Sequence, residues 1–397
     1  MSRYKPYPKY KKSGVEWLGE IPEDWEISRL KYLARIQGGK DQKSVLDDNG
    51  IYPIYGSGGI FGYANQYLYS GESVLLGRKG TVDKPLYVNN KFWTVDTMYY
   101  TIAEKSTIVR WFYYLSTTIN FDFYQYGSAV PSMTQEDLHN INFATPSTEE
   151  QQTIANYLDK ATQKIDTLIQ KQEKLIELLI EKRQALISHV VTKGLDSNVK
   201  MKDSGVAWLG EVPEHWDTIR LKFLCRITTG GKDTENKVDD GKYPFYVRSQ
   251  AIERINSYSY DGEAILTAGD GVGVGKVFHY TNGKFDFHQR VYMFYSFKQV
   301  TGRFLFEYIK NNFYKVALAG AAKSTVDSLR LPLIQNFMIT VPPLQEQQQI
   351  AEYLDTQTTK IDTLIQKARQ AITLLKERRE ALISVAVTGK IDVRKGK

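Results

Sequence analysis

A glycine-rich segment, Gly269–Lys276, is the part of the sequence closest to a phosphate-binding loop. It reads GDGVGVGK, and in such loops backbone N–H groups surround a phosphate that the lysine also contacts. The P-loop pattern requires glycine where Asp270 stands and serine or threonine where Val277 stands. The dinucleotide-binding pattern G-x-G-x-x-G is not met either. We therefore expect a tight turn between two strands here, and no nucleotide site.

Other residue types that support catalysis also lack suitable spacing. The five histidines (His139, His189, His215, His279 and His288) show no zinc-ligand spacing, and Cys225 is the single cysteine. A DNA amino-methyltransferase requires an Asn/Asp-Pro-Pro-aromatic loop to hold its target amine, and the sequence contains no such tetrapeptide. The dipeptide Glu104-Lys105 is too common to indicate a nuclease. We therefore predict no catalytic residue, no metal site and no cofactor in this chain.

Polar and basic side chains in glycine-rich loops offer a different chemistry, hydrogen bonding to nucleic acid. Arginine and lysine pair with guanine, asparagine and glutamine with adenine, and lysine, hydroxyl groups and backbone amides bind phosphates. The net charge of +7 and the pI near 9.0 favour a polyanionic partner. Candidates in the first half, on the turns YGSGGIFGY and GRKGT, are Tyr55, Ser57, Tyr63, Arg78, Lys79 and Thr81.

The second half offers a comparable set of candidate contacts. These residues are Arg248, Ser249, Gln250, Arg254, Lys276, Gln289 and Arg290, and the later loops GSAVPSM and GAAKST add Ser128, Ser132, Lys323, Ser324 and Thr325. For any one of these residues the alternative is a solvated surface side chain. Arg78, Lys79 and Arg248 are the preferred candidates because they lie in glycine-rich loops that differ between the two halves.

Internal repetition determines how these loops must be positioned. Ser13–Ile36 and Ser204–Ile227 are identical at 16 of 24 positions, and the offset of 191 residues becomes 196 at the helices further on. The chain is therefore a duplicated unit of about 190 residues. In each copy two tryptophans are expected to anchor the core: Trp17 and Trp25, then Trp208 and Trp216. Short apolar runs such as SVLLG and AILTA, separated by glycine-rich turns, predict strands, and RWFYYLSTTI and RFLFEYIKNNF predict short helices.

Each copy ends in a long helical segment, Gln151–Thr192 and Gln347–Thr388. Neither segment contains proline or glycine, and apolar residues recur with a period of 3.5, which predicts a heptad seam. Each helix would be roughly 60 Å long. Ser147 and Glu150 predict a capping box at the first helix, and Gly194 and Gly389 predict the two C-terminal ends. Two such helices in one chain are expected to pack against each other as a coiled coil, and antiparallel packing would put one domain at each end.

Composition places the chain among ordinary globular proteins. Hydrophobic residues make up 42% and charged residues 24% of the sequence. No apolar run approaches the roughly 18 residues of a membrane span, and the N-terminus lacks the apolar core of a signal peptide. A single cysteine suits a reducing compartment. The expectation is a cytoplasmic protein without a membrane partner.

The chain resembles, over nearly its full length, the DNA-specificity (S) subunit of type I restriction–modification systems. The resemblance is carried by SGVEWLGEIPEDW with its repeat SGVAWLGEVPEHW, and by the pattern P-x-x-x-E-Q-x-x-I-A-x-Y-L-D at Pro146–Asp159 and Pro342–Asp355. It implies an α+β fold with two pseudo-repeated globular target-recognition domains, joined by two long helices packed as an antiparallel coiled coil. The expected boundaries are 1–146 and 197–342 for the domains, and 147–196 and 343–397 for the spacer helices.

The resemblance also implies the partners. Each domain would recognise one half of a split double-stranded DNA target, two methyltransferase (M) subunits would bind the helices, and restriction (R) subunits would join to cut DNA. S-adenosylmethionine, ATP and magnesium would belong to those partner subunits. Apolar residues beyond the heptad seam predict the partner-binding surface: Ile180, Ile187, Val191, Ile383 and Val387. The alternative function is a non-catalytic coiled-coil scaffold that links two protein-binding domains.

Overall fold

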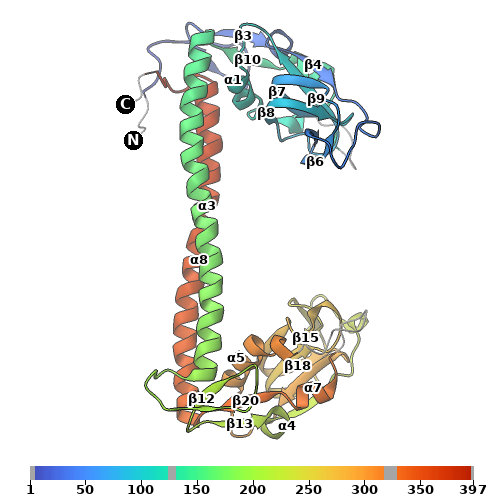
Figure 1. Cartoon of the computed structure of the whole chain (residues 1–397), viewed down its shortest axis with the longest axis vertical. Coiled ribbons are helices and arrows are strands. Elements are labelled where there is room, and N and C mark those ends of the chain that lie inside the picture. Colours follow the sequence, from blue (N-terminus) through green and yellow to red (C-terminus); the bar gives the residue numbers. More distant parts are fainter. Residues whose placement is uncertain (1–4, 124–130, 317–328, 395–397) are drawn as a thin grey trace. The chain divides into compact units, whose positions relative to one another are not determined.

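The chain folds into two structural units that share both long helices. The computed structural model describes residues 5–123, 131–316 and 329–394 (Figure 1). Unit 1 comprises Met1–Glu173 with Gln370–Lys397, and unit 2 comprises Lys174–Arg369. Each unit therefore holds one globular domain, part of helix α3 (Thr148–Lys193) and part of helix α8 (Leu344–Val387).

The domain of unit 1 is built on a six-stranded sheet with the order β4-β9-β7-β8-β5-β6. All neighbouring strands are antiparallel except β5 and β8, which are parallel. Unit 1 also contains two separate two-stranded ribbons, β1-β2 and β3-β10. The elements are β1 (Tyr10–Lys12), β2 (Glu20–Pro22), β3 (Glu26–Arg29), η1 (Leu30–Tyr32), β4 (Ala34–Gly38), β5 (Tyr52–Gly56), β6 (Gly59–Ala64), β7 (Tyr69–Gly77), β8 (Leu86–Thr94), β9 (Met98–Ala103), α1 (Val109–Ser116), η2 (Phe121–Phe123), α2 (Gln135–Asn140) and β10 (Asn142–Thr145).

The domain of unit 2 repeats this topology. Its sheet has the order β14-β19-β17-β18-β15-β16, again with one parallel pair, β15 with β18. The predicted α+β repeat is therefore confirmed. The elements are β11 (Met201–Asp203), β12 (Glu211–Pro213), β13 (Asp217–Arg220), α4 (Leu221–Leu224), β14 (Arg226–Thr229), η3 (Thr234–Asn236), β15 (Tyr243–Tyr246), β16 (Ile252–Ile255), β17 (Tyr260–Ala268), η4 (Gly271–Gly273), β18 (Phe278–Phe287), β19 (Val291–Tyr295), α5 (Gly302–Asn312), α7 (Leu331–Gln335) and β20 (Met338–Val341).

Both faces of each sheet are buried, as the alternation of side chains along the central strand shows. In β7, Val74 and Leu76 join the core formed with α1, α3 and α8, whereas Leu75 packs on the opposite face with Phe92. Trp25 and Trp216 are fully buried core anchors, as predicted. The other two tryptophans differ from the expectation. Trp17 is largely exposed and meets Phe143 edge-on, and Trp208 is half-buried and stacks on Phe337.

The long helices end where glycine was expected to stop them. Gly194 and Gly389 have φ values of +83° and +73°, which favour glycine after a helix. At the start of α3, Ser147 Oγ accepts the Glu150 N–H at 3.3 Å, but the Glu150 carboxylate accepts the Tyr7 hydroxyl at 2.7 Å. Only half of the predicted capping box therefore forms.

The second long helix is shorter than the predicted segment 343–397, because α8 ends at Val387. Residues after α8 pack in unit 1, where Asp392 pairs with Lys5.

A buried glutamine fixes the start of each long helix to its own domain. In unit 2, Gln347 Oε1 accepts the Thr301 N–H at 2.8 Å, and its Nε2 donates to the carbonyl oxygens of Gln299 and Pro342 at 2.9 and 2.8 Å. In unit 1, Gln151 makes the same bonds with Ile108, Ser106 and Pro146. The recurring E-Q of the repeat therefore has a structural role, because it satisfies backbone groups that burial would otherwise leave unpaired.

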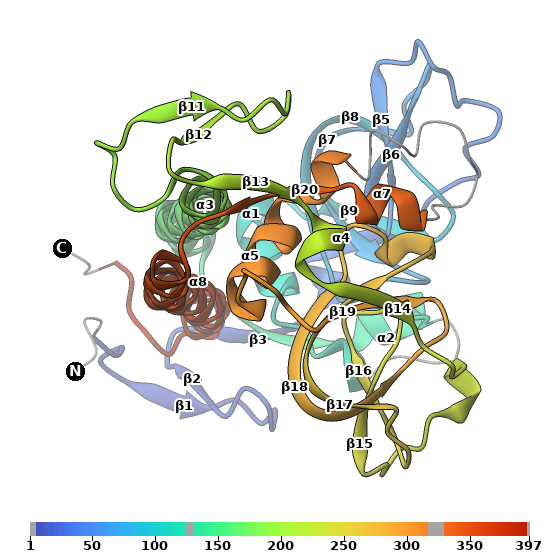
Figure 2. The same ribbon diagram turned by 90° about the horizontal axis from the view of Figure 1, so that it is seen from below.

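Within each unit, the segments of α3 and α8 lie side by side (Figures 1 and 2). In unit 2, Leu179 in the second half of α3 packs with Ile361 and Ile365 in the first half of α8. In unit 1, Asp166 of α3 accepts a 2.9 Å bond from Arg379 near the end of α8. In both cases the second half of one helix meets the first half of the other, so the predicted antiparallel packing is confirmed.

A network of four side chains, repeated in both units, ties each sheet to its helix. In unit 1, the Arg110 guanidinium on α1 contacts the Asp159 carboxylate on α3 at 2.6 Å and covers the ring of Tyr87 on β8, whose hydroxyl donates to Glu72 on β7. The corresponding residues of unit 2 are Arg303, Asp355, Tyr280 and Glu263. Helix α5 thus lies between the sheet and α8 (Figure 2). The same four-residue network occurs in two domains whose sequences otherwise diverge. This indicates that each sheet has the same orientation relative to its long helix in both units.

Candidate nucleic-acid interface

In unit 1, loops from distant parts of the sequence meet at one edge of the domain. The Lys40 N–H donates to Thr94 O at 2.9 Å, and the Arg78 N–H donates to Thr97 O at 2.9 Å. The Gly80 N–H donates to Pro131 O, and Lys79 forms an isolated bridge with Ser132. We call these segments the first loop cluster: Gly39–Lys40, Tyr55–Gly58, Arg78–Thr81, Thr94–Thr97 and Pro131–Ser132.

Arg78 and Lys79 are the two exposed cations of the turn that follows β7. Arg78 Nη1 donates to the Asp96 carbonyl oxygen at 3.2 Å, and its guanidinium lies 6.0 Å from the centre of the Tyr99 ring. One hydrogen bond leaves most of the five guanidinium N–H donors facing solvent. The turn therefore presents positive charge with donors suited to a phosphate or a base edge.

The equivalent loops of unit 2 form a second loop cluster, which consists of Gly230–Asp233, Arg248–Ser249, Asp270–Gly271 and His288–Arg290. Here the Gln289 N–H donates to Lys232 O, and the Gly269 N–H donates to Arg290 O, both at 2.8 Å. The same strand ends therefore position both clusters. Their side chains differ, which is the pattern expected if the two domains bind different ligands.

A single carboxylate organises the two arginines of the second loop cluster. Arg248 Nη1 and Arg290 Nη1 donate to separate oxygens of Asp270, at 2.9 and 2.6 Å. Burial opposes the ionisation of Asp270, but the hydrogen bonds from the two guanidinium groups outweigh this effect and hold its pKa below the ordinary value. The hydrogen bond with Asp270 likewise raises the pKa of Arg290.

A second carboxylate, Asp233, contacts the neighbouring polar side chains. Gln289 Nε2 donates to Asp233 at 2.6 Å, and His288 Nε2 lies 3.8 Å from the other carboxylate oxygen. Burial lowers the pKa of His288, so the imidazole is neutral near pH 7 and the pair carries no salt bridge. The cluster therefore combines charged arginine donors with a fixed amide, a set able to discriminate between bases.

Two lysines of these clusters, Lys40 and Lys232, were not among the predicted contacts. Both belong to a GGKD tetrapeptide that occurs at 38–41 and again at 230–233, in a region where the copies otherwise diverge, and that recurrence could have identified them. A Cβ on Gly39 would lie 1.9 Å from Val95 O, and one on Gly230 would lie 2.0 Å from Phe287 O. Glycine is therefore required for these loops to reach the strand ends.

The remaining predicted contacts are distributed unevenly. Tyr63 pairs with Pro53, and Arg254 pairs with Pro244 at the same point of the second sheet, near the opposite end of the hairpin from the clusters. At that end of the hairpin, Arg254 Nε donates to Gly241 O. Tyr63 and Arg254 therefore both lie away from their loop clusters. Tyr55 is half-buried against Phe92. Residues at the clusters or in turns directly next to them are Ser57, Thr81, Ser132, Ser249, Gln250, Lys276 and Gln289, while Ser128, Lys323, Ser324 and Thr325 lie outside the described residues.

Four of the five predicted partner-binding side chains are instead part of the chain's own core. Ile187 and Val191 are fully buried in the core of unit 2, and Ile383 and Val387 are buried in that of unit 1. These positions lie near the ends of the helices, where the globular domain of each unit packs around them. The heptad pattern considers only the two helices, so it predicted too little burial for these four residues. Ile180 is 49% exposed and remains a surface residue.

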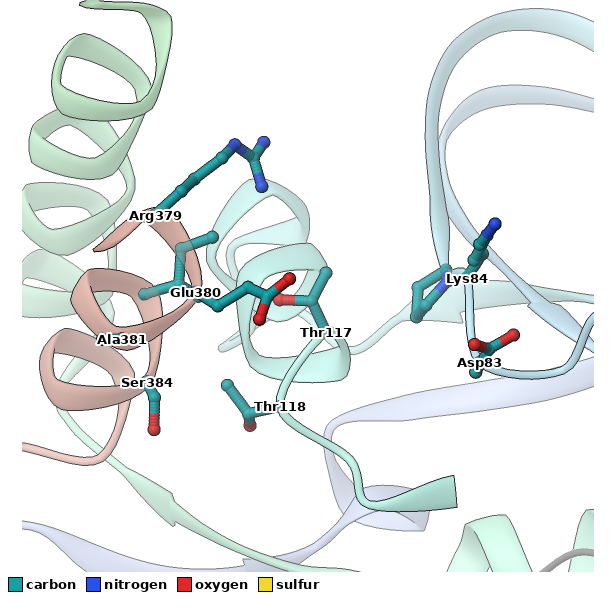
Figure 3. Close-up of a pocket in the computed structure, with 10 residues that line it drawn as sticks. Asp83, Lys84, Thr117, Thr118, Arg379, Glu380, Ala381 and Ser384 are labelled. Carbon is teal, nitrogen blue, oxygen red and sulfur yellow. The ribbon is translucent and has the colours of Figure 1, made fainter. Parts of the chain in front are cut away.

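One surface depression of unit 1 lies apart from the predicted contact residues. A depression in unit 1 is lined by the Asp83–Pro85 loop, Thr117 and Thr118 after α1, and Arg379–Ser384 of α8 (Figure 3). It contains none of the predicted contact residues and mixes both signs of charge. Among the residues that the structure describes, no group of three or more histidine, cysteine or acidic side chains could hold a metal ion. None of the described helices has the length and apolarity to cross a membrane.

Comparison with known proteins gives a consistent result. The family model described as "Type I restriction modification DNA specificity domain" matches residues 22–178 and 213–374. A specificity subunit of the Escherichia coli type I restriction enzyme EcoDI is 31% identical over 182 residues, which are 46% of this chain and 40% of that protein. The MjaVIII specificity subunit of Methanocaldococcus jannaschii is 25% identical over 94% of both chains. A putative specificity subunit of Haemophilus influenzae is 27% identical over 91% of both.

Solved structures support the same fold at low sequence identity. A chain from a study of complex assembly and conformational transition in the type I R-M system has a TM-score of 0.72 at 14% identity. The match covers 94% of this chain and 99% of that one. The HsdS subunit from Thermoanaerobacter tengcongensis has a TM-score of 0.54, also at 14% identity, over 96% and 100% of the two chains.

Proposed function

This chain belongs to the type I restriction modification DNA specificity family, and we propose that it is the subunit that recognises a bipartite, asymmetric DNA sequence. It would direct methyltransferase and restriction subunits to that sequence. The observation that carries the proposal is the pair of loop clusters. The same sheet topology brings Arg78 and Lys79, which follow β7, to one edge of the first sheet. It brings Arg248, which follows β15, and Gln289 and Arg290, which follow β18, to the corresponding edge of the second sheet. A scaffold that only linked protein-binding domains would not require, at these positions, side chains that can donate hydrogen bonds to base edges.

In this proposal the chain contributes recognition, and its partners contribute catalysis. Double-stranded DNA would bind the loop clusters, and two methyltransferase subunits would bind the long helices, with restriction subunits joining the complex. S-adenosylmethionine, ATP and magnesium would be bound by those subunits, in the cytoplasm where the DNA lies. Helices α3 and α8 would act as spacers that determine the gap between the half-sites.

DNA binding by the isolated chain tests the proposal. Mapping methylated bases in host DNA, with and without this gene, would first identify the target sequence. We expect the purified chain to prefer a duplex with that sequence, and to lose affinity about 10³- to 10⁵-fold between 50 and 200 mM salt if it makes 6–10 phosphate contacts. The chain alone should transfer no methyl group from S-adenosylmethionine. Efficient transfer, or salt-independent binding without sequence preference, would contradict the proposal.

The partner surface can be tested with two isoleucines of the same helix. Ile180→Glu changes an exposed side chain, so we expect a stability change within about 0.5 kcal/mol and weaker binding of the methyltransferase subunit. Ile187→Glu places a carboxylate in the core of unit 2 and should unfold that unit. Co-purification with the methyltransferase and thermal unfolding distinguish the two effects. If Ile180→Glu retained full methyltransferase binding, this residue would lie outside the interface.

A further inference from the structure

The turn after the central strand carries opposite charges in the two domains. Lys79 is the second residue after β7, and Asp270 is the second residue after β17. Each is followed by a glycine with positive φ, Gly80 at +85° and Gly271 at +74°. The two turns therefore place their charged residues at equivalent positions. The first loop cluster has two exposed cations at this turn, whereas the second has a carboxylate that contacts two arginines.

Asp270 is held firmly enough to orient those arginines. Its side chain is 16% exposed, whereas those of Arg248 and Arg290 are 43% and 60% exposed. Each guanidinium uses one N–H group on Asp270 and keeps the others available for a ligand. The backbone is also constrained, because a Cβ on Gly273 would lie 2.4 Å from Arg248 O and the Gly269 N–H donates to Arg290 O. The three side chains therefore form one hydrogen-bonded group on closely packed backbone segments.

We infer that Asp270 is a specificity-determining positioning residue, which directs Arg248 and Arg290 toward base edges and limits their use as phosphate contacts. The inference rests on the proposed function. A phosphate contact requires mainly positive charge, whereas a base contact requires donors in a fixed direction. Asp270 supplies that direction and offsets one of the two positive charges. The ligand chemistry that suits the pair is the acceptor edge of guanine, N7 and O6, in the second half-site.

Replacing the carboxylate by an amide tests this directly. With Asp270→Asn, the arginines lose their fixed orientation and the cluster gains one unit of positive charge. We expect binding of non-cognate duplex to strengthen and the slope of log K against log salt to become steeper by about one. We also expect affinity for the cognate duplex to fall, so that the ratio of cognate to non-cognate affinity decreases at least about tenfold. Equilibrium binding of the full chain to both duplexes at several salt concentrations measures these quantities.

Two further variants and one modified duplex separate the effect of orientation from the effect of charge. Asp261→Asn makes the same charge change at the other end of β17, opposite Lys284, and should leave the affinity ratio unchanged. Asp270→Glu restores the charge and should restore the wild-type salt slope. A cognate duplex with 7-deazaguanine in the second half-site lacks the N7 acceptor. It should bind the wild-type chain more weakly but affect Asp270→Asn much less.

The outcomes also distinguish this inference from the proposed function. If the wild-type chain showed no preference for the cognate duplex, the proposed function would be wrong, and the role of Asp270 with it. If the wild type were specific and Asp270→Asn kept the same affinity ratio and salt slope, only the inference would be overturned. Equal weakening on both duplexes, with reduced thermal stability, would assign Asp270 a purely structural role and would also overturn it.

Discussion

Gln347→Met is expected to lower the melting temperature of unit 2 by about 10 °C or more. The substitution keeps the length of the side chain but removes all three of its buried hydrogen bonds, to Thr301, Gln299 and Pro342. Each buried polar group left unpaired costs about 1–3 kcal/mol. A loss of this size is a large part of the roughly 5–15 kcal/mol that stabilises a domain, and about 2–4 °C accompanies each kcal/mol in a unit of this size.

The neighbouring glutamine provides a matched control for this effect. Gln348 is exposed and makes one bond, to Glu352 at 3.0 Å, so Gln348→Met should change stability by no more than about 0.5 kcal/mol. Hydrogen exchange measured by mass spectrometry would locate the damage. We expect Gln347→Met to reduce protection in β13 and β20, and Gln151→Met to reduce it in β3 and β10 of unit 1. Equal stability of the Gln347 and Gln348 variants would show that water replaces the lost bonds.

Exchanging residues 34–141 for the same segment of a relative is expected to change the first half-site and leave the second unchanged. The segment begins with β4 and ends after α2, so the exchanged sheet stays intact while β3 and β10 remain paired. Each mismatched base pair costs about 1–3 kcal/mol. Three changed base pairs would therefore lower affinity for the former target roughly a thousandfold. Long-read mapping of methylated bases in cells with the chimera measures the new target.

The choice of relative for this exchange follows from the side-chain network of unit 1. The donor segment should keep the equivalents of Glu72, Tyr87 and Arg110, because the recipient helix retains Asp159 and needs the Arg110 partner. A donor without that arginine provides the control, and its chimera should be less stable. A change in both half-sites would show that the two domains do not recognise DNA independently.

Local patterns in the sequence predicted the repeat, the long helices and several of the strands and short helices. The strand runs, the short helices and the long helices each depend on side-chain periodicity and on glycine or proline at their ends, which are properties of neighbouring residues. The heptad period also predicted that α3 and α8 pair, because no other described helix has a matching length. The failure at Ile187 and Ile383 has the same origin. Periodicity identifies an apolar face but does not specify whether a partner subunit or the chain's own domain covers it.

The composition of the two loop clusters was decided by tertiary structure alone. Glycine-rich turns indicated Arg78 and Arg248 as contacts, but strand order determines which turns meet. The order β4-β9-β7-β8-β5-β6 brings Lys40 and Arg78 to the same edge, and the position of Tyr63 along its hairpin keeps it away. In the sequence, Asp270 stood out only as one of two residues, with Val277, that break a P-loop pattern. Its role depends on two arginines 22 and 20 residues away, because hydrogen bonds between side chains depend on distance in space and not on separation along the chain.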